Sequence, residues 1–368
     1  MSGSIPSGSE KGRATTGTNN LKLDWRAGLG LGITIVLLWW VMRDVEVAAV
    51  WSEIRGANFL LLALAVTIST ITFFLRALRW KVLLAPLRVE TSLRSRWAAV
   101  TIGFMANNLL PARAGEFARA YALSRLEPVP VSGAFGSLVV ERFLDGFAIV
   151  LFMFVAMGAP GFPSDFAGQD LPLNGIIRTA MVILGALLAL MILMLLFPGI
   201  LLRIVQAVAR FLPQKLGRVL VDALQAFLDG LKVFKNPRLL LLAIIWSLGI
   251  WAWQSLAFWV AFRAFGIEVG YDAALFVNAI VAFAVGVPAA PGFFGTFHAG
   301  AKMGLAVYGI PAGSTLAFAF GFHLGGFFPV TFIGLYYAWK LGLSLKEVET
   351  SEERVEEAVE KAQPGGRP

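Results

Sequence analysis

Residues 239–262 read LLLLAIIWSLGIWAWQSLAFWVAF, a run of 24 residues without a charged side chain. A helix of this length spans about 36 Å, enough to cross a bilayer hydrocarbon core of roughly 30 Å. A second apolar run, at 176–197, is nearly as long. Runs of this length predict transmembrane helices.

The composition extends this conclusion to the whole chain. Of its 368 residues, 58% are hydrophobic and only 15% are charged, against about 45–50% and about 25% in soluble domains. This balance excludes a soluble enzyme, a nucleic-acid-binding protein and a disordered chain. With no cysteine and only two histidines, we expect no disulfide, no metal site and no cofactor. The Lys and Arg residues that give the chain its net charge of +8 lie beside apolar runs. Their expected partner there is an anionic lipid surface.

The apolar segments predict an all-α polytopic membrane protein with six full crossings. Lys and Arg gather in the connections 76–96 and 199–238, whereas 158–175 has neither. Because basic connections stay in the cytoplasm, we expect both of them, and both termini, on that side of the membrane. The expected crossings are about 26–42, 59–75, 132–157, 176–198, 239–262 and 314–339.

We expect one transmembrane domain over residues 25–340, between a disordered cytoplasmic tail at 1–24 and a charged tail at 341–368. Within the domain, residues 199–238 carry apolar side chains at helical spacing among basic ones. That pattern is typical of an amphipathic segment on the cytoplasmic membrane surface. A soluble helical hairpin packed on the bundle explains it equally well.

Two further segments are apolar but interrupted by proline. Residues 97–125 break at NNLLP (107–111), and residues 273–310 break at PAAPG (288–292). To keep the predicted orientation, the first must enter and leave on the cytoplasmic side and the second on the external side. Two such re-entrant segments are typical of an inverted-repeat transporter. A hairpin of two thin helices in each place would also enter and leave on the same side of the membrane.

The first candidate site follows the earlier break, in NNLLPARAGEFAR (107–119). Charged groups near membrane depth are costly and usually mark a site or a pathway. Glu116 lies three residues from both Arg113 and Arg119, so either pair fits one helix face. Together with Asn108, these residues are candidates for binding an anion. The alternative is a cytoplasmic loop whose charges face water.

A second candidate, Glu141-Arg142-x-x-Asp145, lies inside the expected crossing 132–157. The two carboxylates share one helix face and repel each other unless a cation separates them. The functional interpretation is that arginines hold a phosphate while a carboxylate carries a coupling proton. The alternative is a buried ion-pair network that only stabilises the bundle.

A third candidate follows the later break. Gly292 and Gly295 permit a sharp turn or the close approach of a head group. Thr296 and His298 are the polar side chains beside them, and a histidine there is able to carry a proton. A helix break made for packing, with a structural histidine, is the alternative.

Arg76, Arg79 and Trp80 end the second expected crossing, at its cytoplasmic interface. Arginines that extend to the interface beside a tryptophan are ordinary membrane anchors. Recruitment of anionic head groups is the functional alternative.

Taken together, these motifs resemble the lysylphosphatidylglycerol synthase transmembrane-region family, over about residues 25–340. The resemblance implies a flippase-like multi-pass protein of a bacterial or archaeal cytoplasmic membrane, since in lipid-aminoacylating members this region is credited with moving the modified lipid. Here His298 stands where an acidic residue often occurs, and we expect this protein to lack the aminoacyltransferase domain of those members. The matching motifs are Arg76-x-x-Arg79-Trp80, Asn108-x-x-Pro111-x-Arg113-x-Gly115-Glu116-x-x-Arg119, Glu141-Arg142-x-x-Asp145 and Pro291-Gly292-x-x-Gly295-Thr296.

The resulting hypothesis is a protein that binds an anionic phospholipid or a polyprenyl-phosphate-linked sugar and moves it across the membrane. No G-x-x-x-x-G-K-[ST] motif is present, so transport is expected to be passive or ion-coupled. The alternatives are a membrane-embedded glycosyl- or phospholipid-modifying transferase, and a non-catalytic membrane subunit of an envelope-biosynthesis enzyme. We expect no nucleic-acid partner.

Overall fold

The computed structural model describes residues 25–163, 198–211 and 236–344, except 44, 88, 111–113, 288 and 289, together with 182, 217, 221, 347, 348, 350 and 351. This part of the chain is helical, without β-strands. Its longer helices are α1 (Trp25–Met42), α3 (Phe59–Leu84), α6 (Val131–Met157), α10 (Pro237–Ala264) and α13 (Ala312–Lys340). Its shorter ones are α2 (Val47–Gly56), α4 (Leu93–Leu109), α5 (Gly115–Leu126), α8 (Pro198–Ala209), α11 (Tyr271–Ala284) and α12 (Thr296–Ala306), with the 3₁₀ turns η1 (Ala85–Leu87) and η5 (Pro291–Phe293).

The long helices make this an integral multi-pass membrane protein. Helices α3, α10 and α13 are long and apolar enough to cross a membrane. Five of the six expected crossings coincide with α1, α3, α6, α10 and α13. The sixth, 176–198, falls outside the described residues except at 182 and 198, and of the predicted segment 199–238 only α8, a few neighbouring residues and the start of α10 are described.

Local sequence explains where two of the crossing helices begin. The side-chain oxygen of Asn58 accepts from the backbone N–H groups of Leu60 and Leu61, both at 3.1 Å. Asn236 caps α10 in the same way, and proline follows it at the first helical position. A helix start leaves backbone N–H groups unpaired. The asparagine side chains accept hydrogen bonds from some of these groups, and the proline has no N–H to leave unpaired.

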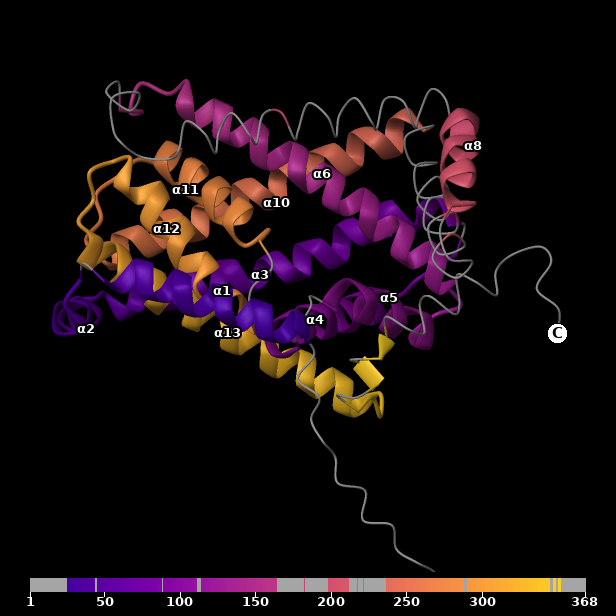
Figure 1. Ribbon diagram of the computed structural model, residues 1–368, viewed down its shortest axis with the longest axis horizontal. Helices are drawn as coiled ribbons and strands as arrows, with labels where there is room; N and C mark the ends of the chain where they lie inside the picture. The colour runs from indigo at the N-terminus through magenta and orange to yellow at the C-terminus, as the bar shows by residue number, and fades with distance from the viewer. Residues whose placement is uncertain are drawn as a thin grey trace, which may run out of the picture.

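The two proline-interrupted segments each form a pair of short helices that pack against each other, α4 with α5 and α11 with α12. The helices stop where the sequence predicts, at Leu110–Ala114 and at 285–295. We call these pairs the first and second hairpins. Figure 1 shows them toward opposite ends of the bundle.

The order long–short–short–long occurs twice, in α3–α6 and in α10–α13. A sequence motif marks the repeat, because Pro111-x-x-x-Gly115-x-Phe117 recurs 180 residues later as Pro291-x-x-x-Gly295-x-Phe297. Moved by that offset, α3 covers 239–264, α5 covers 295–306 and α6 covers 311–337. The observed helices α10, α12 and α13 start within two residues of those positions.

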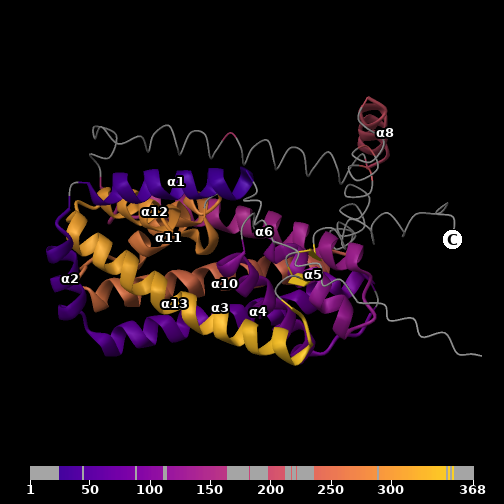
Figure 2. The same cartoon turned by 60° about the horizontal axis from the view of Figure 1, so that its bottom comes forward.

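The two units also pack with a two-fold pattern. Helices α3 and α10 run antiparallel, since Asn58 N–H donates to Ala264 O at 2.8 Å while Trp253 Nε1 donates to Ile68 O at 2.8 Å. The first hairpin packs on α13 through α4, and the second packs on α6 through α11. Antiparallel central helices give the two units opposite orientations, which is the geometry of an inverted repeat. Figure 2 shows α13 running beside α3 and α4 on one side of the bundle.

The tips of the hairpins meet inside the bundle. A Cβ added at Gly292 would lie 3.3 Å from the backbone oxygen of Asn108, and η5 packs against α4. Gly292 has φ +72°, a conformation that glycine adopts without strain. The two breaks predicted from the sequence are therefore in contact.

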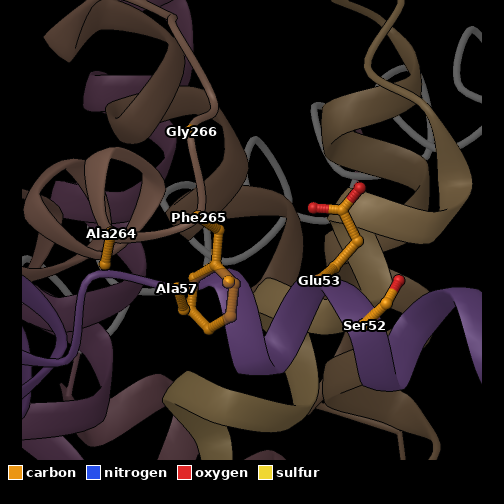
Figure 3. A pocket seen from close by; sticks show the side chains of 7 residues that line it. Ser52, Glu53, Ala57, Ala264, Phe265 and Gly266 are labelled. Carbon is orange, nitrogen blue, oxygen red and sulfur yellow. The ribbon is translucent and has the colours of Figure 1, made fainter.

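A shallow hollow of about 380 Å³ lies at the α2 end of the molecule. Small residues line it together with Ser52, Glu53 and Phe265 (Figure 3). It adjoins Asn58 and Ala264, whereas Arg79 lies 21 residues farther along α3, about 30 Å of helix. The charged motif of α3 thus lies far from this hollow.

Candidate functional site

Charged side chains from three helices converge inside the first unit. Helix α3 supplies Arg76 and Arg79, α5 supplies Glu116 and Arg119, and α6 supplies Glu141, Arg142 and Asp145. We call these seven residues the arginine–carboxylate cluster. Its core is buried: the exposed fraction is 0% for Arg79 and Glu141 and 2–7% for Arg76, Arg119 and Asp145.

Asp145 holds the two arginines of α3. Arg76 Nη1 donates to Asp145 Oδ2 at 2.9 Å, and Arg79 Nη1 donates to Asp145 Oδ1. Arg79 also donates to Ser247 Oγ on α10 at 2.9 Å. Because Arg76 and Arg79 are three residues apart on α3, one carboxylate reaches both.

Glu141 is the centre of the other half of the cluster. Its Oε1 atom lies 2.7 Å from Arg119 Nη1, 3.0 Å from Arg142 Nη2 and 3.1 Å from Arg79 Nη2. A single carboxylate oxygen thus receives groups from α3, α5 and α6. Charge-assisted hydrogen bonds of this kind are the strong class.

The cluster is not saturated. Within the described structure, no hydrogen-bond partner is found for Arg79 Nε, for Nε and Nη2 of Arg119, or for Glu141 Oε2. Unpartnered buried polar groups cost free energy and are rare in folded proteins. Nε and Nη2 form the edge of the guanidinium that matches a phosphate or a carboxylate. Arg119 therefore presents a free anion-binding edge.

Trp80 fixes the position of that arginine. The Arg119 guanidinium carbon lies 4.0 Å from the centroid of the Trp80 ring. The ring is itself held, because Trp80 Nε1 donates to Ser137 Oγ at 2.9 Å. Arg119 is thus stacked on a fully buried, hydrogen-bonded platform, in a cation–π arrangement.

The charges in the core do not balance. Among the described residues, three buried arginines (Arg76, Arg79 and Arg119) face two buried carboxylates (Glu141 and Asp145), which leaves one positive charge in excess. The pair at the rim, half-exposed Arg142 and Glu116, is neutral overall, with 3.9 Å between its charged atoms. A buried excess charge is costly unless a counter-ion joins it, so the core is arranged to accept one negative charge.

The second unit serves as an internal comparison. With the 180-residue offset, the positions equivalent to the core charges are all uncharged, although this unit forms the same four helices. The fold therefore does not require charges at these places. The equivalents of Arg76, Arg79, Arg119, Glu141 and Asp145 are Leu256, Trp259, Ala299, Gly321 and Gly325.

The structure places three predicted residues differently from the expectation. Arg76, Arg79 and Trp80 were expected at the cytoplasmic interface, but Arg79 and Trp80 are fully buried and Arg76 nearly so. The carboxylates of α6 supply their counter-charges. Helix α3 itself continues to Leu84, past its expected end at 75. The membrane-anchor interpretation is therefore wrong.

The first hairpin contributes two of its four predicted residues to the cluster. Arg119 pairs with Glu141 on α6, whereas Glu116 approaches Arg142. Asn108 instead bridges α4 to α13, where its Nδ2 donates to Thr331 Oγ1 at 2.8 Å. Arg113 lies outside the described residues.

The predicted residues of the second hairpin do not join the cluster. Gly292 contacts Asn108, and a Cβ on Gly295 would lie 3.1 Å from the backbone oxygen of Thr34 on α1. Thr296 Oγ1 donates to the backbone oxygen of Phe293 at 3.0 Å. His298 is fully buried among aromatic rings. The glycines serve close packing of the tip.

Sequence reasoning did not single out Ser247 or the role of Trp80 as a platform. Ser247 interrupts the apolar run 239–262, and that interruption was the available signal. The stacking of Trp80 on Arg119 had no signal in the sequence, because α3 and α5 approach each other only in the fold.

Comparison with known proteins identifies the family of this chain. The family model described as the lysylphosphatidylglycerol synthase TM region matches residues 28–334. Among curated proteins, a UPF0104 membrane protein of Methanothermobacter thermautotrophicus is 25% identical over 87% of this chain and 94% of its own length. Another from Methanocaldococcus jannaschii is 25% identical over 63% of this chain and 70% of its own.

A shorter match links the chain to a glycosyltransferase, AglD of Haloferax volcanii. The two are 30% identical over 32% of this chain and 19% of that protein. No solved structure matches.

Proposed function

The chain belongs to the lysylphosphatidylglycerol synthase transmembrane-region family, and from that premise we propose that it binds the phosphate of an anionic lipid at the arginine–carboxylate cluster and moves that head group between the leaflets. The observation that carries the proposal is the buried, net-positive core with an unpartnered Arg119 edge. The uncharged second unit supports it, because the charges are not needed for the fold.

The chemistry favours a phosphate over other partners. Arginine recognises phosphate through two parallel N–H groups, and Arg119 has Nε and Nη2 free. One anionic phosphate would neutralise the excess charge of the core. Half-exposed Arg142, which contacts both Glu141 and Asp145, borders the route that a head group would take from the rim.

The inverted repeat supports movement rather than storage. Transporters built from inverted repeats place the site between the repeats and alternate access to it by rocking one repeat against the other. Here the hairpin tips meet at Gly292 and Asn108, and Asn108 belongs to the hairpin that carries Glu116 and Arg119 of the cluster. In this proposal the hairpins are re-entrant, the basic connections and both termini lie in the cytoplasm, and the cluster is loaded from that side.

Two lipid classes are proposed as cargo: phosphatidylglycerol derivatives and polyprenyl-phosphate-linked sugars. The family description supports the first. The partial similarity to a glycosyltransferase supports testing the second. An envelope-biosynthesis enzyme that makes or uses the lipid is the proposed protein partner.

Binding is tested by native mass spectrometry of the purified protein with identification of retained lipids. We expect wild type to retain one anionic class and Arg119→Gln to lose it. Lys302→Gln is the matched control, since it removes a half-buried positive charge from the second hairpin. Equal retention of mixed lipids by all three proteins would contradict the proposal.

Movement is tested in reconstituted vesicles with a head-group-labelled lipid whose outer-leaflet signal is chemically quenched. Loss of one charge-assisted bond costs about 1.5–3 kcal/mol, so Arg119→Gln should slow transfer about tenfold or more. Lys302→Gln should transfer at the wild-type rate. Specific lipid binding without transfer would favour the envelope-subunit alternative, and conversion of the lipid with an activated donor would favour the transferase.

A further inference from the structure

The only two histidines of the chain lie together in the second hairpin region. His298 on α12 and His323 on α13 have ring centroids 5.3 Å apart. Phenylalanine rings surround them: Phe320 lies 4.1 Å from His298, and Phe297 stacks on His323 at 4.5 Å. The cluster-based function described above does not use either histidine.

Their nitrogens are buried without partners. His298 is fully buried, and neither of its ring nitrogens has a hydrogen-bond partner in the described structure; the same holds for Nδ1 of His323. An imidazole in such a position gives up hydrogen bonds worth of order 1–3 kcal/mol. A phenylalanine would fill the same aromatic surroundings without that cost, so packing alone does not explain two histidines.

Among the described residues, no counter-charge stabilises a proton on the pair in this conformation. In that part of the chain, His323 is the titratable group that acts on His298. Lys302, one turn along α12, donates instead to the backbone oxygen of Val41 at 2.9 Å. Within the described structure, neither ring interacts electrostatically with the other charged residues on the packed helices. These are Asp272 (α11), Lys340 (α13), Arg238 and Arg263 (α10), Arg76, Arg79 and Lys81 (α3), Arg94 and Arg96 (α4), and Glu53 and Arg55 (α2).

The pair adjoins the strained tip of the second hairpin. His323 makes a backbone hydrogen bond with Gly292, and the Phe294 ring lies 5.0 Å from His323. Gly292, Phe293 and Gly295 all have positive φ, which is unfavourable for the phenylalanine. Strain of this kind persists where surrounding contacts enforce it, and it concentrates at segments that switch.

We propose that His298 and His323 form a proton-binding site that is empty while the hairpin tip packs against α4 and that takes up one proton when the tip moves away. Hydronium in the water that enters with the movement supplies the proton: one of its O–H bonds breaks, an N–H bond forms at a ring nitrogen lone pair, and a neutral water molecule remains. With ring centroids 5.3 Å apart, the two rings are close enough to share that proton through one water. Return of the tip to the buried position expels it, because burial disfavours an unpaired charge.

The composition of the chain makes this directly measurable. With two histidines, a protein labelled with ¹³C and ¹⁵N in histidine alone gives two sets of ring signals, which single variants assign. With no cysteine, spin labels at Leu109→Cys and Val287→Cys report the distance between the two hairpin tips without background. Both positions are exposed.

In nanodiscs, we expect the histidine signals to titrate between about pH 7 and pH 5, and the label distance to lengthen over the same range. In the His298→Phe and His323→Phe double variant, the distance should stay short at every pH. Tyr308→Phe is the matched control, since it removes another unpartnered polar group of the second unit and should behave as wild type.

Histidines that stay neutral down to about pH 4 would overturn the proposal, and so would titration without a change in distance. If the spin labels disturb folding, the histidine titration of the protein without spin labels still tests the proposal. Neither measurement involves lipid transfer, so failure here and failure of the lipid proposal are distinguishable.

Discussion

Asp145 is the residue on which the α3 side of the cluster depends. It accepts from both Arg76 and Arg79, and its exposed fraction is 2%. The carboxylate is thus the main counter-charge for two cations that water does not reach.

We predict that Asp145→Asn destabilises the protein by about 3–5 kcal/mol, because it leaves the arginines of α3 short of a partner in a buried place. Reversible unfolding in mixed detergent measures the difference. The combined Arg76→Gln and Asp145→Asn variant should recover part of the loss, as expected for residues in direct contact. Strictly additive effects of the two changes would argue against the ion pair at 2.9 Å.

At the scale of elements, each hairpin depends on a glycine where its two helices touch. A Cβ at Gly103 would lie 2.7 Å from the backbone oxygen of Gly115 and 2.8 Å from Arg119 Cβ. In the second hairpin, a Cβ at Gly300 would lie 2.8 Å from Val281 Cα. Small residues allow helices to approach closely in a membrane, where packing rather than the hydrophobic effect drives association.

We predict that Gly103→Ala destabilises the fold by about 1–3 kcal/mol through overpacking. It also displaces Arg119 and therefore weakens lipid retention. Gly249→Ala on α10 is the control, because nothing lies within 4 Å of its Cβ position and alanine is the better helix former. The unfolding assay and native mass spectrometry are repeated on both; equal stability of the two variants would refute the close contact.

At the scale of the whole molecule, the repeat and the basic residues at its ends together predict an orientation in the membrane. The first unit begins at Asn58, beside the end of α10 at Ala264. Exposed Lys81 and Arg94 lie beyond the buried cluster, toward the far end of α3 and at the start of α4. Because basic ends of membrane helices stay in the cytoplasm, the topology proposed above predicts that this end of the first unit faces the cytoplasm.

Single cysteines test that orientation, since the chain has none of its own. A membrane-impermeant maleimide should label Ser52→Cys in intact cells and Arg94→Cys only after permeabilisation; both residues are exposed. Ala99→Cys is the control for a buried position and should stay unlabelled. Labelling of Arg94→Cys from outside would reverse the topology proposed here.

Much of the architecture followed from the sequence because its signals are local. Apolar runs of sufficient length predict α1, α3, α6, α10 and α13, and proline with glycine predicts the breaks in both hairpins. Each signal acts within one or two helical turns, so no knowledge of the fold is needed. The repeated Pro-x-x-x-Gly-x-Phe motif was also present, but it becomes significant only once the helices align at the same offset.

The candidate site depended on the tertiary structure. The sequence alone shows that Arg119, Glu141 and Asp145 are charged and near membrane depth. Only the fold brings Arg76 to Asp145, 69 residues away, and Arg119 to Glu141, 22 residues away. An arginine beside a tryptophan at a helix end looks like a membrane anchor until the counter-charges on α6 are seen. Whether a charge faces lipid, water or another charge is decided by helix packing, because electrostatic pairing in a low-dielectric interior depends on distance in space rather than along the chain.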